Sequence, residues 1–132
     1  MERIFLDANV LFSAAHKHDA NFLKFWRLKD VRLISSPYAA AEAQRNLKSE
    51  EQRRRLNRLL QSVEFISPVA DRPLPAGVHL PDKDAPILLG AIAARATHLL
   101  TGDDHHFGAY YGKTIEGVLI LSPAAYILTR PL

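Results

Sequence analysis

The chain has 132 residues, of which 48% are hydrophobic and 23% charged, with no cysteine and a formal net charge of +3. This length fits one domain over residues 1–132, and this composition excludes a disordered tail, a collagen-like repeat, disulfides and a thiolate zinc site. The longest apolar run, residues 85–94, has about half of the roughly 20 residues that span a bilayer, and Asp7 interrupts the N-terminal apolar residues too early for a signal peptide. We therefore expect a cytoplasmic protein with no membrane partner.

The charges are distributed unevenly along the chain. Residues 45–58 contain six basic and two acidic side chains, whereas residues 82–104 contain four aspartates and two basic side chains. The basic stretch suits contact with phosphates, and the acidic stretch suits cations.

The predicted elements of the N-terminal half alternate between strands and helices. Residues 3–6 form a short apolar strand that ends at Asp7, and residues 10–15 form a short helix. A second helix begins at Asp19 as its N-cap and carries the apolar stripe of residues 22–28. Residues 31–35 form the next strand, after which Ser36 and Pro37 start a helix that continues through residue 47.

The alternation continues in the C-terminal half. Ser49 and Gln52 resemble a capping box and predict a helix over 50–61, which is followed by a strand over 63–66. A proline-containing loop over 67–82 leads to an apolar helix over 83–96 and a strand over 98–101. A polar connection, a strand over 118–121 and a short helix opened by Ser122 complete the chain. Apolar strands alternating with helices predict an α/β fold with a parallel sheet covered on both faces.

Acidic residues recur where ligands gather in such a sheet, beyond the carboxyl ends of the strands. Asp7 follows the first strand, Asp103 follows the fourth, and Asp84 begins the helix that leads into the fourth. If the first and fourth strands are neighbours, Asp7 and Asp103 project into one crevice that Asp84 can reach. Crowded carboxylates repel one another unless a divalent cation lies among them, and Mg²⁺ and Mn²⁺ prefer oxygen ligands. The pattern therefore predicts a metal site.

Each of these residues also has a purely structural interpretation. Asp84 suits an N-cap, Glu42 suits a solvated helix position, and Asp103 and Asp104 suit a turn after glycine. Asp7 is the hardest to explain in this way, because a carboxylate that closes a buried strand needs a partner. His105 and His106 are adjacent, so we expect a solvated loop there rather than a pair of ligands.

Three segments in this order, FLDANVLF, SPYAAAEAQRNL and DKDAPILLGAIAARATHLLTGDDHHF, resemble the PIN-domain family. The resemblance extends from residue 3 to about residue 121. It implies five parallel strands in the order 3-2-1-4-5 flanked by helices, and a nuclease that uses Mg²⁺ or Mn²⁺ and acts usually on RNA. The residues that match the four family acids are Asp7, Glu42, Asp84 and Asp103.

The same resemblance assigns supporting residues. Asn9 matches the small polar residue that commonly supports the first acid, and Thr101 matches the hydroxyl residue ahead of the last. Asp82, two residues before Asp84, is an alternative match for the third acid. Asp104 directly follows Asp103 and would share or replace its duty.

The leading hypothesis is a metal-dependent endoribonuclease in which the four acids hold Mg²⁺ or Mn²⁺ and Arg45 and Lys48 hold the RNA backbone. Many PIN relatives are toxins of the VapC type that pair with a small antitoxin and often form dimers, for which residues 22–28 would supply an apolar face. Others process RNA.

Two alternatives use the same residues differently. A non-catalytic PIN-like module would bind RNA or protein without cutting, but all four matching positions are acidic here. A phosphotransfer enzyme would use Asp7 as its nucleophile with a second aspartate two residues on, where this chain has Asn9.

Overall fold

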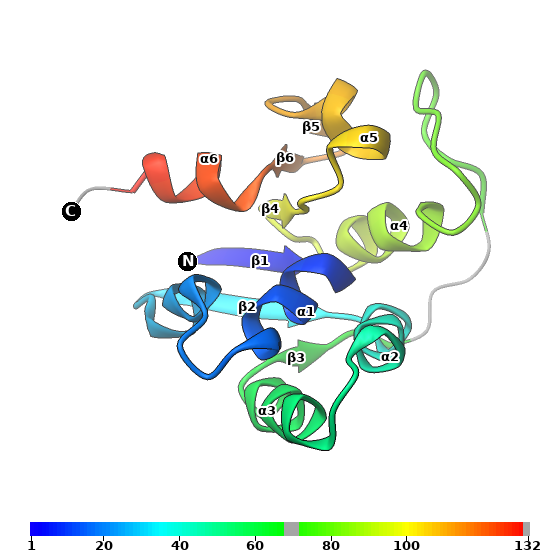
Figure 1. Cartoon of the computed structure of the whole chain (residues 1–132). Helices are drawn as coiled ribbons and strands as arrows, with labels where there is room; N and C mark the ends of the chain where they lie inside the picture. The colour runs from blue at the N-terminus through cyan, green and yellow to red at the C-terminus, as the bar shows by residue number, and fades with distance from the viewer. Residues whose placement is uncertain (68–71, 131–132) are drawn as a thin grey trace.

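The computed structural model describes residues 1–67 and 72–130. Its centre is a six-stranded sheet in the order β3-β2-β1-β4-β6-β5 (Figure 1). The strands are β1 (Glu2–Leu6), β2 (Val31–Ser35), β3 (Glu64–Phe65), β4 (His98–Leu100), β5 (Thr114–Ile115) and β6 (Val118–Leu121). All neighbouring pairs are parallel except β5 and β6, which are antiparallel. The fifth predicted strand is β6, so the predicted α/β class and the order of the five parallel strands are confirmed.

The edge strand β5 is an addition to the predicted sheet. It joins β6 through Glu116 and Gly117, which both have positive φ angles, 46° and 85°. Two residues of this kind form the tight turn that matches the twist of a hairpin. Glutamate rarely takes that conformation, and the usual hairpin signals are Asn-Gly and Asp-Gly. The Glu-Gly pair therefore did not predict a hairpin.

Six α-helices and two 3₁₀ helices surround the sheet within the described ranges. They are α1 (Ala8–His16), η1 (Asn21–Arg27), α2 (Pro37–Asn46), α3 (Glu50–Leu60), α4 (Ala85–Ala93), α5 (Asp104–Phe107), η2 (Gly108–Tyr110) and α6 (Pro123–Leu128). The predicted serine caps are confirmed: the hydroxyls of Ser36, Ser49 and Ser122 each accept a backbone N–H, and Ser49 and Gln52 form both bonds of a capping box.

The predicted second helix is present, but its N-cap at Asp19 was wrong. Asp19 is exposed, and the segment begins two residues later as the 3₁₀ helix η1, without a side-chain cap. A 3₁₀ helix has three residues per turn, so residues three apart in sequence lie on one side. Phe22 and Phe25 have this spacing and pack edge-to-face with 5.9 Å between ring centroids, and Phe25 is buried. The three-residue spacing of the aromatic rings thus favours the tighter helix.

Helix α4 is shorter than the predicted helix over 83–96. It begins at Ala85 and ends at Ala93, because Arg95 adopts a left-handed backbone with φ 55° that an α-helix cannot continue. Within the predicted loop over 67–82, residues 68–71 lie outside the described part of the chain.

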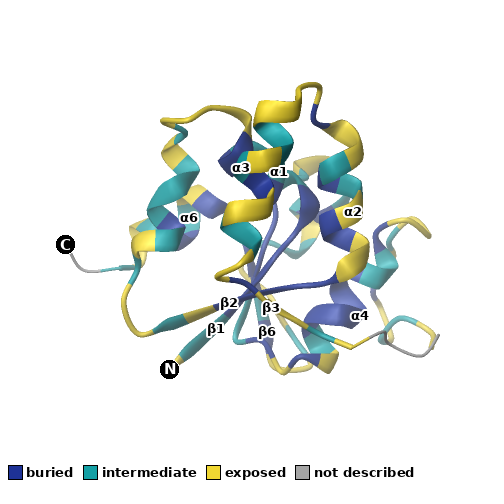
Figure 2. Ribbon diagram, turned by 90° about the horizontal axis from the view of Figure 1, so that it is seen from below, coloured by how far each residue is buried: buried dark blue, intermediate teal, exposed yellow. Residues whose placement is uncertain are grey.

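The core lies on both faces of the sheet. Ile4, Phe5 and Leu6 of β1 are all fully buried, as expected for a parallel strand covered on both sides. Helices α1, α2 and α3 lie together on one side, with α1 between the other two, and α4 contacts this group mainly through α2 (Figure 2). Gly90 lets α4 pack closely, because an added Cβ would lie 3.3 Å from Phe5 Cζ. None of the described helices has the length and apolarity needed to cross a membrane.

Candidate active site

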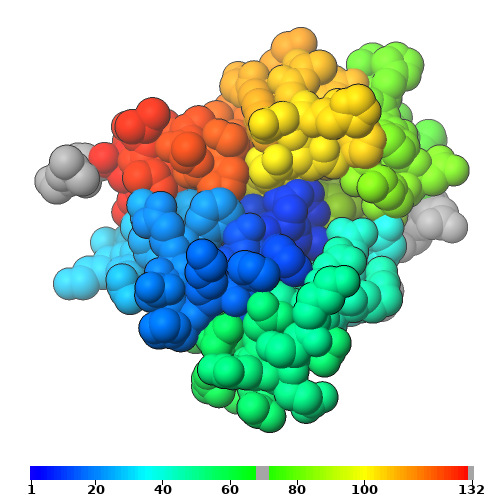
Figure 3. Space-filling model, viewed as in Figure 1, coloured from blue at the N-terminus to red at the C-terminus, as the bar shows by residue number. Residues whose placement is uncertain are grey.

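The order of the strands brings predicted acids together at the carboxyl ends of the parallel strands, which form one edge of the sheet. Strands β1 and β4 are parallel neighbours with Leu6 opposite Leu100, and the Asp7 N–H donates to the Leu100 carbonyl at 3.1 Å. Asp7 and Thr101 therefore follow the carboxyl ends of adjacent strands, as the sequence predicts. In Figure 3 the segments that follow these strands adjoin the beginnings of α2 and α4 on one face of the molecule.

Asp7 is buried at this edge, with only 4% of its surface exposed, and hydrogen bonds hold its carboxylate in place. Its Oδ1 accepts the Ala8 N–H at 2.6 Å, which caps α1, and its Oδ2 accepts the Thr101 hydroxyl at 2.8 Å. The Asn9 amide donates to Asp7 Oδ2 and to Thr101 Oγ1, at 3.3 Å in each case. Asn9 and Thr101 thus occupy positions from which they orient the carboxylate.

The same network extends to the loop after β4. Asn9 Oδ1 accepts the Gly102 N–H at 2.8 Å, and Thr101 Oγ1 accepts the Asp103 N–H at 3.1 Å. Residues at the start of α1 therefore determine the path of the chain into Asp103. The Asn9 and Thr101 side chains thus place Asp103 relative to Asp7 by accepting backbone N–H groups of the loop.

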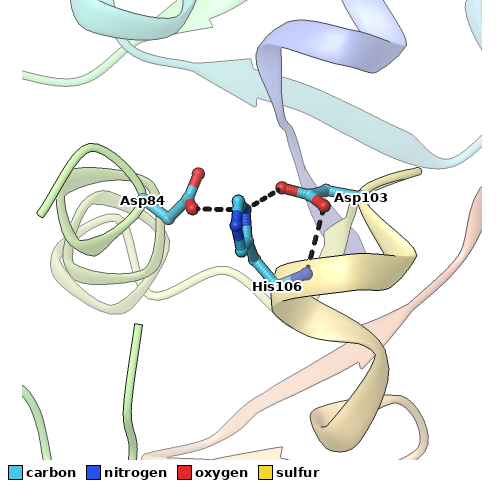
Figure 4. A group of neighbouring side chains, drawn as sticks. All are labelled: Asp84, Asp103 and His106. Atoms are coloured by element: carbon cyan, nitrogen blue, oxygen red, sulfur yellow. Dashed lines mark hydrogen bonds and ion pairs between the residues drawn. The ribbon is translucent and has the colours of Figure 1, made fainter. Parts of the chain in front are cut away.

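A second cluster consists of Asp84, Asp103 and His106 (Figure 4). Asp103 caps the one-turn helix α5, because its Oδ1 accepts the His106 N–H at 3.1 Å. The His106 ring nitrogen Nδ1 lies 2.8 Å from Asp103 Oδ2 and 2.9 Å from Asp84 Oδ2. The expectation of a solvated loop at His106 was therefore wrong: the ring lies between two of the predicted acids.

The local sequence explains why His106 was missed. Adjacent histidines normally point in different directions. Residue 106 is three positions after Asp103, and the single helical turn of α5 brings residues at this spacing to the same side. The Asp-x-x-His spacing was the available signal, and it has meaning only once the turn is known to be helical. His105, by contrast, is exposed.

Asp84 is not a helix cap, although it stands at the N-cap position of α4. Its side chain makes no capping bond, the residue is 8% exposed, and its Oδ2 has no hydrogen-bond partner. His106 Nδ1 carries at most one hydrogen, and its hydrogen bond is with Asp103. One carboxylate oxygen of Asp84 is thus buried without a donor, an arrangement that a cation would relieve.

Glu42 enters from α2, half-buried, and its charge helps to raise the pKa of Asp7. The neighbouring Tyr38 is 40% exposed and donates its hydroxyl to the Lys83 carbonyl at 2.6 Å, which joins the first turn of α2 to the segment before Asp84. Burial, followed by the charges of Glu42 and Asp84, raises the pKa of Tyr38.

Burial and crowding of like charges shift the acids in different directions. Burial raises the pKa of Asp7 to about 6 against the hydrogen bonds from Thr101 and Ala8, with smaller contributions from Glu42 and Asp84. Burial also raises the pKa of Asp84, which His106 partly offsets. For Asp103 the effect of burial is outweighed by the backbone and ring of His106, which hold its pKa below the ordinary value.

The remaining predicted residues lie outside the Asp84–Asp103–His106 cluster. Asp82 is exposed, and Asp104 is exposed and accepts the Tyr111 hydroxyl at 2.8 Å. Arg45, in the last turn of α2, and Lys48, just beyond it, are both exposed.

The ligand atoms of Asp84, Asp103 and His106 all lie within 4.8 Å of one another. Two carboxylates and one imidazole are suitable ligands for a divalent metal, and the donor-less oxygen of Asp84 points into the same space. The residues present therefore fit a divalent cation.

Solved structures of similar fold come from two-component complexes. VapBC2 from Rickettsia felis bound to a DNA fragment from its promoter aligns with a TM-score of 0.65 at 20% identity, over 91% of this chain and 98% of that chain. FitAcB from Neisseria gonorrhoeae aligns with a TM-score of 0.52 at 20% identity, over 92% and 98%. FitAB bound to an IR36 DNA fragment aligns with a TM-score of 0.53 at 19% identity, over 91% and 94%.

Comparison with curated protein sequences yields no match. The sequence profile of the PIN domain matches residues 3–105, a stretch that contains Asp7, Glu42, Asp84 and Asp103. This match covers well over half of the chain, and the observed sheet order agrees with it. The chain therefore belongs to the PIN-domain family.

Proposed function

We propose that this protein is a metal-dependent endoribonuclease whose acids Asp7, Glu42, Asp84 and Asp103 hold Mg²⁺ or Mn²⁺. The observation that carries the proposal is the buried, donor-less oxygen of Asp84 facing Asp103 and His106 at the edge where Asp7 also lies. Charge of one sign is concentrated here at a cost in free energy, which a cation would offset. PIN domains are generally nucleases, and this chain keeps an acid at each matching position.

The residues divide the work by their surroundings. Asp84 and Asp103 face the same space and would hold the cation directly, while Asp7, just after β1, and Glu42, in α2, would hold it directly or through water. Thr101 and Asn9 keep the Asp7 carboxylate oriented. When bound, a divalent cation activates water and stabilises the charge that develops on the phosphate during hydrolysis.

The proposal extends to the partners. Exposed Arg45 and Lys48 would contact the phosphate backbone of RNA outside the acidic site. The VapBC and FitAB complexes of similar fold are toxin–antitoxin proteins. We extend this to a toxin role for this single nuclease domain in the cytoplasm, with a small antitoxin as its inhibitor and a second copy of the chain as a further partner.

Cleavage of labelled single-stranded RNA tests the proposal. We expect the purified protein to cut the RNA with Mn²⁺ or Mg²⁺ and to lose this activity in EDTA. Asp7→Asn and Asp84→Asn should abolish cleavage while the fold is retained, as judged by circular dichroism. Asp19→Asn removes the same charge at an exposed position outside the predicted site and should cleave like the wild type.

The outcomes separate the alternatives. A folded protein that binds RNA without cutting it under any metal condition would favour the non-catalytic module. Equal cleavage by the wild type and Asp7→Asn would show that the activity is a contaminant and would remove the support for these residues.

A further inference from the structure

His106 occupies a position that the four-acid site does not explain. Its Nδ1 lies almost equally far from Asp103 Oδ2 and Asp84 Oδ2, at 2.8 and 2.9 Å (Figure 4). A nitrogen with at most one hydrogen cannot donate fully to both oxygens. One of the two oxygens is therefore left without a full donor, and the ring nitrogen lies where a third ligand of a shared cation would lie.

The position of the ring is determined by the main chain. Asp103 accepts the His106 N–H through Oδ1, which fixes the first turn of α5 and turns Oδ2 toward the ring. Phe107, the next residue, is fully buried and anchors this turn in the core. Since both neighbours are fixed, His106 has little freedom to leave the cluster, and its side chain is only 24% exposed.

The separations match those between ligands of one ion. Two atoms bound at right angles to an ion, each about 2.1 Å from it, lie about 3 Å apart. The distances from Nδ1 to Asp84 Oδ2 and Asp103 Oδ2 are slightly shorter than this value, so a small separation of the three side chains would admit the ion. One of these two oxygens, Asp84 Oδ2, also has no hydrogen-bond partner and belongs to a residue that is 8% exposed, which indicates that a ligand belongs here.

We infer that His106 Nδ1 is a direct ligand of the divalent cation, so that this centre has mixed nitrogen and oxygen ligands and prefers Mn²⁺ and similar transition metals to Mg²⁺. The inference rests on the proposed function, because it concerns the same cation. Imidazole is a good ligand for first-row transition metals, whereas Mg²⁺ favours carboxylate, carbonyl and water oxygens. The neutral ring would bind through Nδ1 and carry its hydrogen on Nε2.

Electron spin-echo spectroscopy of bound Mn²⁺ tests the inference directly, because a coordinated ¹⁴N modulates the echo. We expect nitrogen modulation in the wild type and its loss in His106→Asn, which offers an amide oxygen or a donor in place of Nδ1. In calorimetric titrations His106→Asn should weaken Mn²⁺ binding about tenfold or more and change Mg²⁺ binding by less than about threefold. His105→Ala, which changes the adjacent exposed histidine, should keep both the modulation and the affinities.

The possible results distinguish this inference from the proposed function. Mn²⁺ binding without nitrogen modulation, or with equal losses of Mn²⁺ and Mg²⁺ affinity in His106→Asn, would overturn the inference alone and leave His106 as a positioning residue. Absence of any Mn²⁺ binding by the wild type would overturn both. Nitrogen modulation that persists in His106→Asn would assign the ligand to another histidine and also overturn the inference.

Discussion

The buried carboxylate of Asp7 should destabilise the metal-free fold at neutral pH, so that Asp7→Asn is more stable than the wild type there. The pKa of Asp7 is raised from 3.8 to about 6 in the folded protein, chiefly by burial. The folded state therefore binds the proton more tightly than the unfolded state. Stability from this group is present at low pH and is lost as the pH rises from about 4 through about 6.

The magnitude follows from the shift. A difference of about two pKa units corresponds to about 3 kcal/mol of lost stability above pH 7. Asparagine removes this cost at every pH but places an amide N–H opposite the Thr101 hydroxyl and the Asn9 amide, which both lose an acceptor at a combined cost of about 1 kcal/mol. Asp7→Asn should thus be more stable by about 2 kcal/mol at pH 8 and less stable by about 1 kcal/mol at pH 4.

Urea denaturation in EDTA measures the effect, with the fluorescence of Trp26, the single tryptophan, as the probe. Trp26 reports on folding because its indole N–H donates to the Leu59 carbonyl between η1 and α3. Asp19→Asn makes the same charge change at an exposed residue and should follow the wild-type curve at both pH values. If Asp7→Asn lowers the stability equally at pH 4 and pH 8, the carboxylate is not held at a cost and the electrostatic reasoning fails.

Two further predictions concern RNA contact and packing. In filter-binding titrations, Arg45→Ala and Lys48→Ala should each weaken RNA binding by a similar factor for all sequences and reduce the slope of log affinity against log salt by about one. An unchanged slope would place the RNA elsewhere. Lys113→Ala, which changes an exposed lysine beyond α5, is the control. Gly90→Ala should lower the free energy of unfolding by about 1 kcal/mol, since the new methyl would lie 3.2 Å from Ile66 and 3.3 Å from fully buried Phe5. Calorimetric unfolding that shows a stabilised Gly90→Ala would mean that the helix propensity of alanine outweighs the crowding.

Much of the fold could be predicted because its signals are local. The serine caps at Ser36, Ser49 and Ser122 follow from hydrogen bonds within one turn, and the buried strands follow from short apolar runs. The parallel order follows from alternating strands and helices together with the resemblance to the PIN family. The weak points were η1 and β5, where a three-residue aromatic spacing and a Glu-Gly turn departed from the common signals.

The sequence by itself determined which acids stand at the ends of strands and helices, because position along an element depends on neighbours in the chain. It could not determine which of these acids face one another. Asp84 rather than Asp82 is buried beside Asp103, and Asp104 turns to Tyr111, because the packing of α4 and α5 decides which side of each turn meets the sheet. The place of His106 depends on the same tertiary contacts. Its ring nitrogen meets Asp84 because the beginnings of α4 and α5, which the chain connects through β4, lie together at that end of the sheet.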